Sequence, residues 1–335
     1  MATMRAAFFE AARTLTVRET PIPEPQLGDV RLRVRFTGIC GSDLSLYTTG
    51  ALAGRDVILG HEISAVVDLD PSGAWEPGAR VVPYPAGRGC GECVWCLEGR
   101  DRYCLNPSGP HGGGNADFLI ASSGSLVPVP DDVDDRSAAL AEPLGVALRA
   151  IERSGAASGH LAYVSGLGSI GLLAASGLAA LGCRVIGADP RVDRRSLGLE
   201  IGCEAVFDPT SEDPFATTLS FDAHGPRVAF ECAGAPESLQ QVIDACGFGG
   251  TVAILGVPMA PAFLLRMLLK ELSAFSIRGP SKATMARALE HVRSRPQVSK
   301  IIGGTVPLEE AGAAFERLLT GDGGVKILVE PDGGR

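Results

Sequence analysis

Four of the nine cysteines lie within the sixteen residues from Gly89 to Cys104. Their spacing, C-x2-C-x2-C-x7-C, can bring four thiolates around one tetrahedral zinc ion, whose charge offsets their mutual repulsion. Because all four positions are then protein ligands, the pattern predicts a structural zinc rather than a catalytic one. The alternative is a zinc ribbon that binds nucleic acid, which the neighbouring acidic side chains disfavour. The predicted ligands are Cys90, Cys93, Cys96 and Cys104.

A second set of metal-binding residue types lies earlier in the chain. Cys40 in GICGSD and His61 with Glu62 in LGHE place a thiolate, an imidazole and a carboxylate within 23 residues, each near the end of an expected strand. Taken singly, such residues are more often part of a core. Together they match the three protein ligands and the exchangeable position of a catalytic zinc. Asp43 is a candidate partner for the ring of His61, and Glu142 offers a further carboxylate at the start of an expected helix.

The stretch YVSGLGSIG (163–171) contains the pattern G-x-G-x-x-G between an expected strand and an expected helix. In this context Gly166 allows a tight turn, Gly168 lets a pyrophosphate approach the backbone, and Gly171 lets the helix pack on the sheet. The N-terminus of that helix favours negative charge. The motif therefore predicts a dinucleotide site, whose loop also contains Leu167, Ser169 and Ile170.

Asp189 ends the next expected strand, 21 residues after Gly168. A carboxylate at this position accepts hydrogen bonds from the adenosine ribose and repels a 2′-phosphate, which favours NAD over NADP. Arg191 and Arg194 keep NADP open, because either side chain can turn toward a phosphate. The alternative interpretation is a structural glycine turn followed by a solvated carboxylate.

Composition limits the class of protein. The 335 residues carry a formal net charge of −9 and no basic block longer than two residues, which argues against nucleic-acid binding. The longest small and apolar run (171–181) is far shorter than the roughly 20 residues of a membrane span, and the first residues lack the apolar core of a signal peptide. We expect a cytoplasmic protein with no membrane segment, in which the cysteines form no disulfide framework.

The elements that position these residues follow two different patterns. Up to about residue 140, runs such as VRLRVRFTGIC (30–40) alternate in polarity between Gly and Pro breaks, which indicates antiparallel β structure. Beyond that point short apolar strands alternate with helices, the first of which has Ser137 as its expected N-cap. That order is typical of a doubly wound parallel sheet, so the predicted fold class is α/β, with a β-rich domain beside such a sheet.

These motifs resemble, in their order, those of the zinc-dependent medium-chain dehydrogenases, which include alcohol, sorbitol and threonine dehydrogenases. The resemblance covers nearly the whole chain and rests on GICGSD, GHE, the four-cysteine stretch, EPLGVAL, the glycine motif, ECAG, GGTVAILGV and KILVE. It implies a GroES-like catalytic domain at 1–143 with a zinc lobe at 88–106, a Rossmann domain at 144–279, and a segment at 280–335 that completes the catalytic domain. It also implies two zinc ions, one catalytic and one structural.

By position, the resemblance implies that Cys40 and His61 bind the catalytic zinc and that Glu62 binds or exchanges at it. Glu142 stands where the polyol and threonine branch of the family has a Glu that either binds zinc or holds its water, and both roles stay open. Ser42 matches the hydroxyl that accepts the substrate proton. The implied cofactor contacts beyond the glycine loop and Asp189 are Arg194, Cys232, Ala233, Gly256 and Val257.

One position departs from the family pattern, because Ser45 stands where many relatives have the His that passes the proton to solvent. A hydroxyl can carry a proton through water but cannot store one at neutral pH, so the relay is expected to use Glu62, Glu142 or ordered water. The run CGSDLSLY also resembles deoxy-scyllo-inosamine dehydrogenases, which oxidise an aminocyclitol. Leu46 and Tyr47 are candidate substrate contacts.

We therefore predict a zinc enzyme that transfers a hydride between NAD and a secondary alcohol of a polyol, cyclitol or amino alcohol. The alternatives are a carbonyl or C=C reductase that uses NADH or NADPH on the same scaffold, and a non-catalytic dinucleotide-binding protein. The apolar strand AFSIRG (274–279) lies at an expected sheet edge, where its unpaired side must be covered by another element or chain. Equivalent strands of the family pair across a dimer axis. We expect a homodimer or a homotetramer.

Overall fold

The computed structural model describes residues 2–51, 56–85, 89–98, 100–107, 112–257 and 260–331. Residues 88 and 99 of the predicted zinc lobe lie outside these ranges. The chain divides into two compact units, which are described separately. The first comprises Met1–Glu142, Met285–Arg293 and Ile302–Arg335, and the second comprises Pro143–Thr284 and Ser294–Ile301.

The first unit contains two β-sheets. The smaller has the strand order β2-β1-β4, and the larger has the order β15-β16-β3-β5-β6-β8, with β7 paired to β3. In β3 the apolar side chains alternate with half-buried ones, as the pattern in 30–40 predicts. The strands are β1 (Thr3–Ala11), β2 (Thr14–Pro21), β3 (Asp29–Gly38), β4 (Val57–Ile58), β5 (Glu62–Leu69), β6 (Arg80–Pro83), β7 (Phe118–Ser122), β8 (Leu126–Pro128), β15 (Ile302–Pro307) and β16 (Lys326–Glu330).

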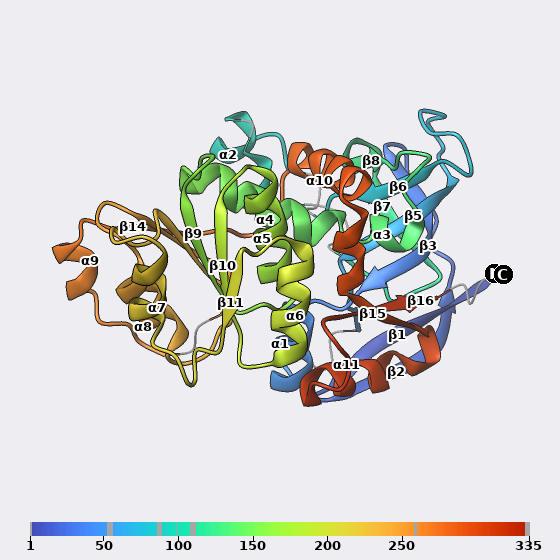
Figure 1. Ribbon diagram of the computed structural model, residues 1–335. Helices are drawn as coiled ribbons and strands as arrows, with labels where there is room; N and C mark the ends of the chain where they lie inside the picture. Colours follow the sequence, from blue (N-terminus) through green and yellow to red (C-terminus); the bar gives the residue numbers. More distant parts are fainter. Residues whose placement is uncertain are drawn as a thin grey trace. The chain divides into compact units, whose positions relative to one another are not determined.

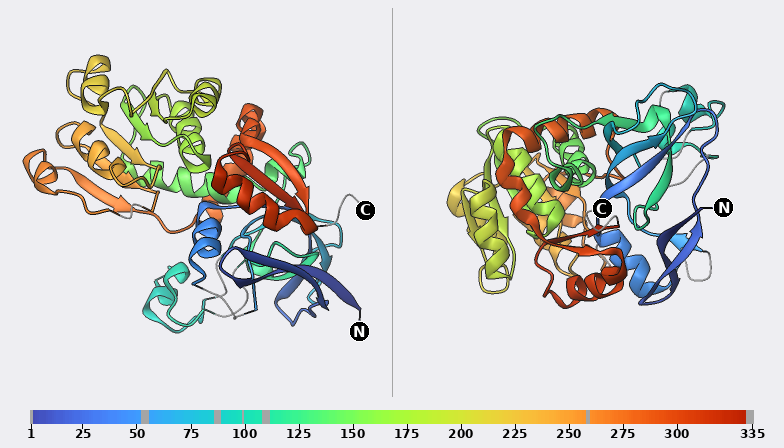
Figure 2. Two further views of the ribbon diagram at one scale, coloured as in Figure 1. Left: turned by 90° about the horizontal axis from the view of Figure 1, so that it is seen from below. Right: turned by 90° about the vertical axis from the view of Figure 1, so that its right-hand side faces the viewer.

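The C-terminal elements belong to the same unit as the N-terminal strands. The last strand, β16, pairs antiparallel with β3, and Figure 2 shows these C-terminal elements (red) beside the N-terminal ones (blue). The short helices of this unit are α1 (Gly41–Thr49), α2 (Val94–Leu97), α3 (Asp135–Ala138) and α11 (Ala311–Thr320), with 3-10 turns at Asp101–Tyr103, Ser123–Ser125 and Leu308–Glu310. Helix α10 (Lys282–Ser294) lies mostly in this unit.

The second unit is a six-stranded, wholly parallel sheet with the order β11-β10-β9-β12-β13-β14. This is the doubly wound order of a Rossmann fold, and it confirms the predicted fold class. Helices α5 and α6 cover one face and α7 and α8 the other (Figure 1). The elements are α4 (Ala141–Ser154), β9 (Leu161–Ser165), α5 (Ser169–Ala180), β10 (Arg184–Ala188), α6 (Val192–Ile201), β11 (Ala205–Phe207), α7 (Pro214–Phe221), β12 (Val228–Glu231), α8 (Ser238–Ala245), β13 (Thr251–Ile254), α9 (Leu265–Leu269) and β14 (Ser273–Ser276).

Three local expectations differ from the structure. Asp134, not Ser137, caps the first helix after the β-rich region, because its carboxylate accepts a hydrogen bond from the Ser137 backbone N–H. The 3-10 turn Pro296–Ile301 belongs to the second unit rather than the first, because it packs against α5 and α6. Tyr47 is packed in the core of the first unit.

The environment of Tyr47 explains why it is not a substrate contact. Its ring packs against Phe9 and Phe315, and only 2% of the residue is exposed. Its hydroxyl donates to the Arg13 carbonyl or to the Glu316 carboxylate, at 2.8 and 3.0 Å. Burial and that carboxylate raise the pKa of Tyr47 to about 12, which keeps the hydroxyl neutral. Among the described helices, none is long and apolar enough to cross a membrane.

Candidate metal centre and dinucleotide pocket

Cys40 is held at the start of α1 by the backbone. It lies in extended conformation as the N-cap of that helix. The Asp43 carboxylate accepts a hydrogen bond from the Cys40 backbone N–H at 3.1 Å, an arrangement that satisfies an N–H the helix itself leaves unpaired. The backbone of Cys40 is therefore fixed by the local turn GICGSD.

Asp43 also orients the imidazole of His61, which directly precedes β5. The Asp43 Oδ1 atom lies 3.4 Å from Nδ1 of His61, the contact by which a carboxylate fixes the ring of a metal ligand. Burial alone lowers the pKa of His61, but the charges of Asp43 and Cys40 outweigh burial and raise that pKa well above its ordinary value. The site therefore attracts positive charge, and a metal ion that binds there must displace a proton.

Glu62, the first residue of β5, forms a buried ion pair that sequence reasoning missed. Lys326 Nζ donates to both carboxylate oxygens, at 2.8 and 2.6 Å, and to the Ile39 carbonyl at 2.9 Å, so that all three of its protons are used. Both residues are 1% exposed. Burial alone lowers the pKa of Lys326, but Glu62 and Cys40 raise it above its ordinary value, so the ammonium stays charged.

Glu142 lies in the first turn of α4 and is buried. Burial and the nearby charges of Glu62 and Asp43 raise its pKa to about 7, against the opposing effect of His61 and Lys326. The protonation of the Glu142 carboxylate therefore depends on these four charged neighbours. The carboxylate is not, however, a member of the group of mutually close ligand atoms.

The structure brings three of the predicted catalytic-zinc ligands together. One ligand atom each from Cys40, His61 and Glu62 lies within 4.8 Å of the others. A thiolate, an imidazole and a carboxylate at this separation are a donor set that zinc accepts. Ser42 and Ser45 lie on exposed positions of α1.

The four cysteines of the predicted zinc lobe also converge. One sulfur from each of Cys90, Cys93, Cys96 and Cys104 lies within 4.8 Å of the other three. Backbone N–H groups, that of Leu105 foremost, lower the pKa of Cys93 to about 6. The Gly91 N–H also lowers the pKa of Cys96, but burial and the neighbouring thiols outweigh it and raise that pKa to about 12. Four thiolates at this spacing need a cation between them, which zinc provides.

The glycine loop of the second unit has the geometry that its motif predicts. Gly166 has φ +88°, and a Cβ there would lie 2.6 Å from the Ala233 backbone. A Cβ on Gly171 would lie 1.8 Å from the Gly166 carbonyl, so the first turn of α5 requires glycine. A Cβ on Gly168, by contrast, meets only Arg194 at 3.8 Å, and that open side leaves room for a ligand.

Polar atoms around this loop fit a bound anion with sugar hydroxyls. The Asp189 carboxylate accepts from the backbone N–H groups of Leu167 and Arg191, both at 2.9 Å. The Arg194 guanidinium lies 3.7 Å from that carboxylate. Ser169 Oγ and Arg194 Nε are buried and, among the described residues, have no hydrogen-bond partner. Such orphaned groups usually serve a ligand or water.

A cavity of about 290 Å³ adjoins the loop, and it contains half of the predicted cofactor contacts. Gly166, Gly168, Asp189, Arg194, Cys232 and Ala233 line it. The side chain of Leu167 is buried against Gly187 and Gly198 instead. Ser169, Ile170, Gly171, Gly256 and Val257 do not line this cavity. The loop after β12 is ordered by Glu231, a buried residue that sequence reasoning missed, which accepts hydrogen bonds from Ala233, Gly234 and Ser238.

Two family models match the chain. Residues 26–131 match the alcohol dehydrogenase GroES-like domain, and residues 169–294 match the zinc-binding dehydrogenase model. The first range contains Cys40, His61, Glu62 and the four-cysteine lobe. The second range begins at Ser169 and contains the last three residues of the glycine loop.

Several known proteins are similar over almost their full length. A sorbitol dehydrogenase of Halalkalibacterium halodurans is 30% identical over 94% of this chain and 95% of its own. A 2-dehydro-3-deoxy-L-galactonate 5-dehydrogenase of Pseudoalteromonas atlantica is 30% identical over 98% of both chains. A putative zinc-binding dehydrogenase of Sinorhizobium meliloti, solved with bound NADP, is 28% identical and superposes with a TM-score of 0.87 over 99% of this chain and 100% of its own.

Proposed function

Because the chain belongs to the zinc-dependent medium-chain dehydrogenases, we propose that it transfers a hydride between a secondary alcohol of a polyol, cyclitol or amino alcohol and NAD. The observation that carries the proposal is the convergence of Cys40, His61 and Glu62 in a chain that also has an adenosine-sized pocket with a carboxylate at its ribose position. Relatives that act on sorbitol and on a sugar acid support the substrate class.

We assign the catalytic zinc to Cys40, His61 and Glu62, with Glu142 as a further carboxylate, and the structural zinc to the four-cysteine lobe. When bound, zinc supplies the positive charge that lowers the pKa of an alcohol, and NAD supplies the carbon that accepts the hydride. Lys326 holds the Glu62 carboxylate, and Asp43 holds the Cys40 backbone and the His61 ring. These contacts preorganise the ligands before any metal binds.

The chain offers a proton route that does not need a histidine at position 45. Ser42, two residues after Cys40 and exposed, can accept a proton from an alcohol and donate its own. Glu62 is occupied by Lys326, so Glu142 is the better proton acceptor of the two carboxylates. Its pKa of about 7 falls when a dication binds nearby, which leaves it ionised and able to accept a proton at neutral pH.

The surroundings of Asp189 support NAD rather than NADP. Its carboxylate is 3% exposed, lines the cavity, and is held by two backbone N–H groups. A 2′-phosphate at the ribose would meet this negative charge. The Arg191 guanidinium donates to the Asp193 carboxylate at 2.8 and 3.1 Å.

The test of this function is reduction of NAD by the zinc-loaded protein on a panel of alcohols. The panel contains sorbitol, threonine, myo-inositol, an aminocyclitol and simple secondary alcohols, and it is repeated with NADP. We expect turnover of at least one polyol or cyclitol with NAD that is lost in Cys40→Ala. Tight NADH binding without turnover on any alcohol would instead favour a carbonyl or C=C reductase.

We also propose that the protein forms a homodimer, or a dimer of such dimers, through the segment around α9 and β14. Within the part of the chain that the structure describes, β14 pairs only with β13 and is an edge strand. The neighbouring segment exposes Phe263, Leu264 and Leu268, at 69%, 61% and 75%. A run of exposed apolar side chains beside an unpaired edge strand is the usual sign of a protein interface.

A further inference from the structure

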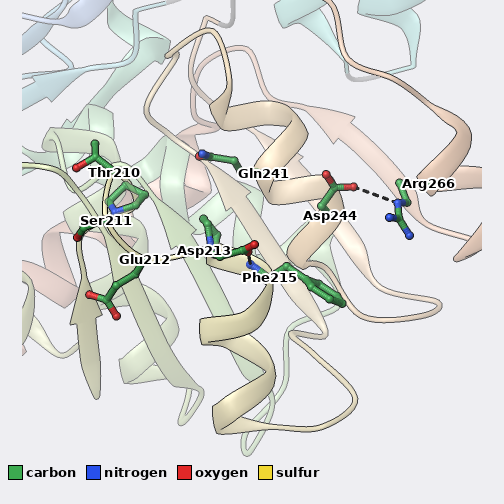
Figure 3. Close-up of a pocket in the computed structure, with 10 residues that line it drawn as sticks. Thr210, Ser211, Glu212, Asp213, Phe215, Gln241, Asp244 and Arg266 are labelled. Carbon is green, nitrogen blue, oxygen red and sulfur yellow. Dashed lines mark hydrogen bonds and ion pairs between the residues drawn. The ribbon is translucent and has the colours of Figure 1, made fainter.

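A second cavity lies beside the pocket that contains Asp189. It has a volume of about 520 Å³ and is lined by residues 209–215, Gln241, Asp244 and Arg266 (Figure 3). Pro209, Thr210 and Gln241 line both cavities. These three residues therefore stand at the boundary between the two cavities, and Gln241 is the one with a flexible polar side chain.

Gln241 and its neighbour Gln240 differ in what their amides do. The Gln240 amide donates to Asp244 at 3.2 Å and accepts from the Phe263 N–H at 2.7 Å, so it is a structural group. The half-buried Gln241 amide has no hydrogen-bond partner among the described residues. Figure 3 shows its amide end directed away from α8 and toward the side of the cavity where Thr210 lies.

The position of Asp189 determines what this amide would meet. If the adenosine ribose is held by Asp189, its base extends along the pocket, whose remaining walls include Pro209, Thr210 and Gln241. Adenine presents an amino donor beside a ring-nitrogen acceptor, and the amide of Gln offers the complementary acceptor and donor. Of these three residues, Thr210 already donates its hydroxyl to Asp208 at 2.6 Å and Pro209 has no polar side chain, so Gln241 has the side chain that is available to the base.

We propose that Gln241 recognises the adenine of the cofactor, by accepting a hydrogen bond from the N6 amino group and donating one to N7. This inference rests on the proposed dinucleotide binding. It makes Gln241, which lies outside the glycine loop, the residue that selects adenine over other bases. It also gives a role to the amide of the Gln240–Gln241 pair that makes no hydrogen bond within the described residues.

The test compares two reduced dinucleotides that differ only in the base. Nicotinamide hypoxanthine dinucleotide carries a carbonyl oxygen where NADH carries the N6 amino group. We expect the wild-type protein to bind NADH about tenfold more tightly, because O6 and N7 of hypoxanthine are both acceptors and the amide can donate to only one of them while its own oxygen faces the other. In Gln241→Leu the affinity for NADH should fall about tenfold, whereas the affinity for the hypoxanthine analogue should change little. The ratio of the affinity for NADH to the affinity for the analogue should then approach one.

Gln240→Leu is the matched control, because it alters the same helix at the adjacent position and should keep the wild-type ratio. Gln241→Glu keeps the acceptor but loses the donor, so its ratio should lie between those of the wild type and Gln241→Leu. A wild-type protein that binds both dinucleotides equally, or a Gln241→Leu variant that keeps the ratio, would overturn the inference. A wild-type protein that binds neither would overturn the proposed function itself.

The second cavity provides an independent readout. If the N6 group faces Gln241, shortening this side chain opens the way into the cavity of about 520 Å³. Gln241→Ala should then bind NADH that carries a benzyl group on N6 more tightly than the wild type does, while it binds unmodified NADH less tightly. Equal or weaker binding of the benzyl analogue would show that N6 does not face Gln241.

Discussion

Gly38 illustrates how tightly the candidate zinc site is packed at the level of single residues. A Cβ at this position would lie 2.1 Å from Oε2 of Glu62, well below any contact that two atoms can make. The buried Glu62 carboxylate can therefore contact Lys326 and lie close to the ligand atoms of Cys40 and His61 only because residue 38 has no side chain.

We expect Gly38→Ala to displace the Glu62 carboxylate and so to remove about one zinc per chain relative to the wild type, with NAD-dependent turnover reduced at least about tenfold. Plasma spectrometry measures the zinc content. The affinity for NADH should be unchanged, because the NADH pocket lies in the second unit. Gly41→Ala is the control, since a Cβ added there would have no other atom within 4 Å. Equal zinc content in both variants would contradict the assignment.

The Lys326–Glu62 pair should dominate the stability of the same region. Removing one partner of a buried ion pair leaves an uncompensated charge, which costs about 3–5 kcal/mol. We expect Lys326→Met to lose that much free energy of unfolding in urea. The exposed pair of Lys300 and Glu200, at 2.6 Å, provides the comparison, because Lys300→Met should cost at most about 1 kcal/mol. Similar losses in the two variants would show that Lys326 is not a structural charge.

At this scale the sequence allowed some residues of the candidate site to be predicted and concealed others. Cys40, His61 and Glu62 belong to short motifs whose residue types indicate a metal site. Lys326 belongs to no such motif. It lies 264 residues from Glu62 and begins the apolar run KILVE, where it resembles an ordinary strand end. Gln241 is likewise invisible without the structure, since only the hydrogen bonds of Gln240 show which of the two amides is free.

Among the elements, the four-cysteine lobe is the one most dependent on its metal. Its only regular structure, within the described residues, is the single turn of α2 and a 3-10 turn at Asp101–Tyr103, too little to bury a core. The contacts that remain include the Arg100 guanidinium, which lies 4.7 Å from the ring of Trp95 and 5.1 Å from that of Tyr103.

We expect Cys96→Ser to lose one zinc per chain and to make the lobe susceptible to trypsin at Arg100 and Arg102, while the zinc bound near Cys40 is retained. Limited proteolysis with metal analysis checks both points. Cys183→Ser, at a buried cysteine outside both clusters, should change neither. A lobe that resists trypsin in Cys96→Ser would show that zinc does not order it.

Element types followed well from periodicity, whereas element ends did not. The alternation in β3 and the short apolar strands of the parallel sheet identify their structure, because a face of each must be buried. The N-cap at Asp134 was missed because Ser137, three residues later, is an equally good cap by type. The placement of Pro296–Ile301 in the second unit depends on packing against α5 and α6, which no local pattern encodes.

For the whole molecule, self-association through the α9 segment is the property to test. We expect Leu268→Asp to convert the dimer to a monomer in sedimentation velocity at micromolar concentration, because a carboxylate in an apolar interface loses its solvation without a partner. Leu199→Asp, at a residue of α6 that is 50% exposed, should leave the association unchanged. A wild-type protein that sediments as a monomer would refute the dimer.

Hydride transfer from the carbon of a secondary alcohol to NAD is the reaction on which the proposed function depends. The most direct measurement uses the best alcohol of the panel, labelled with deuterium at the reacting carbon, with mass spectrometry of the reduced cofactor formed by the zinc-loaded protein. We predict one deuterium per NADH molecule and no labelled NADH from Cys40→Ala. Deuterium found only in water, or labelled NADH formed equally well by Cys40→Ala, would contradict hydride transfer at this site.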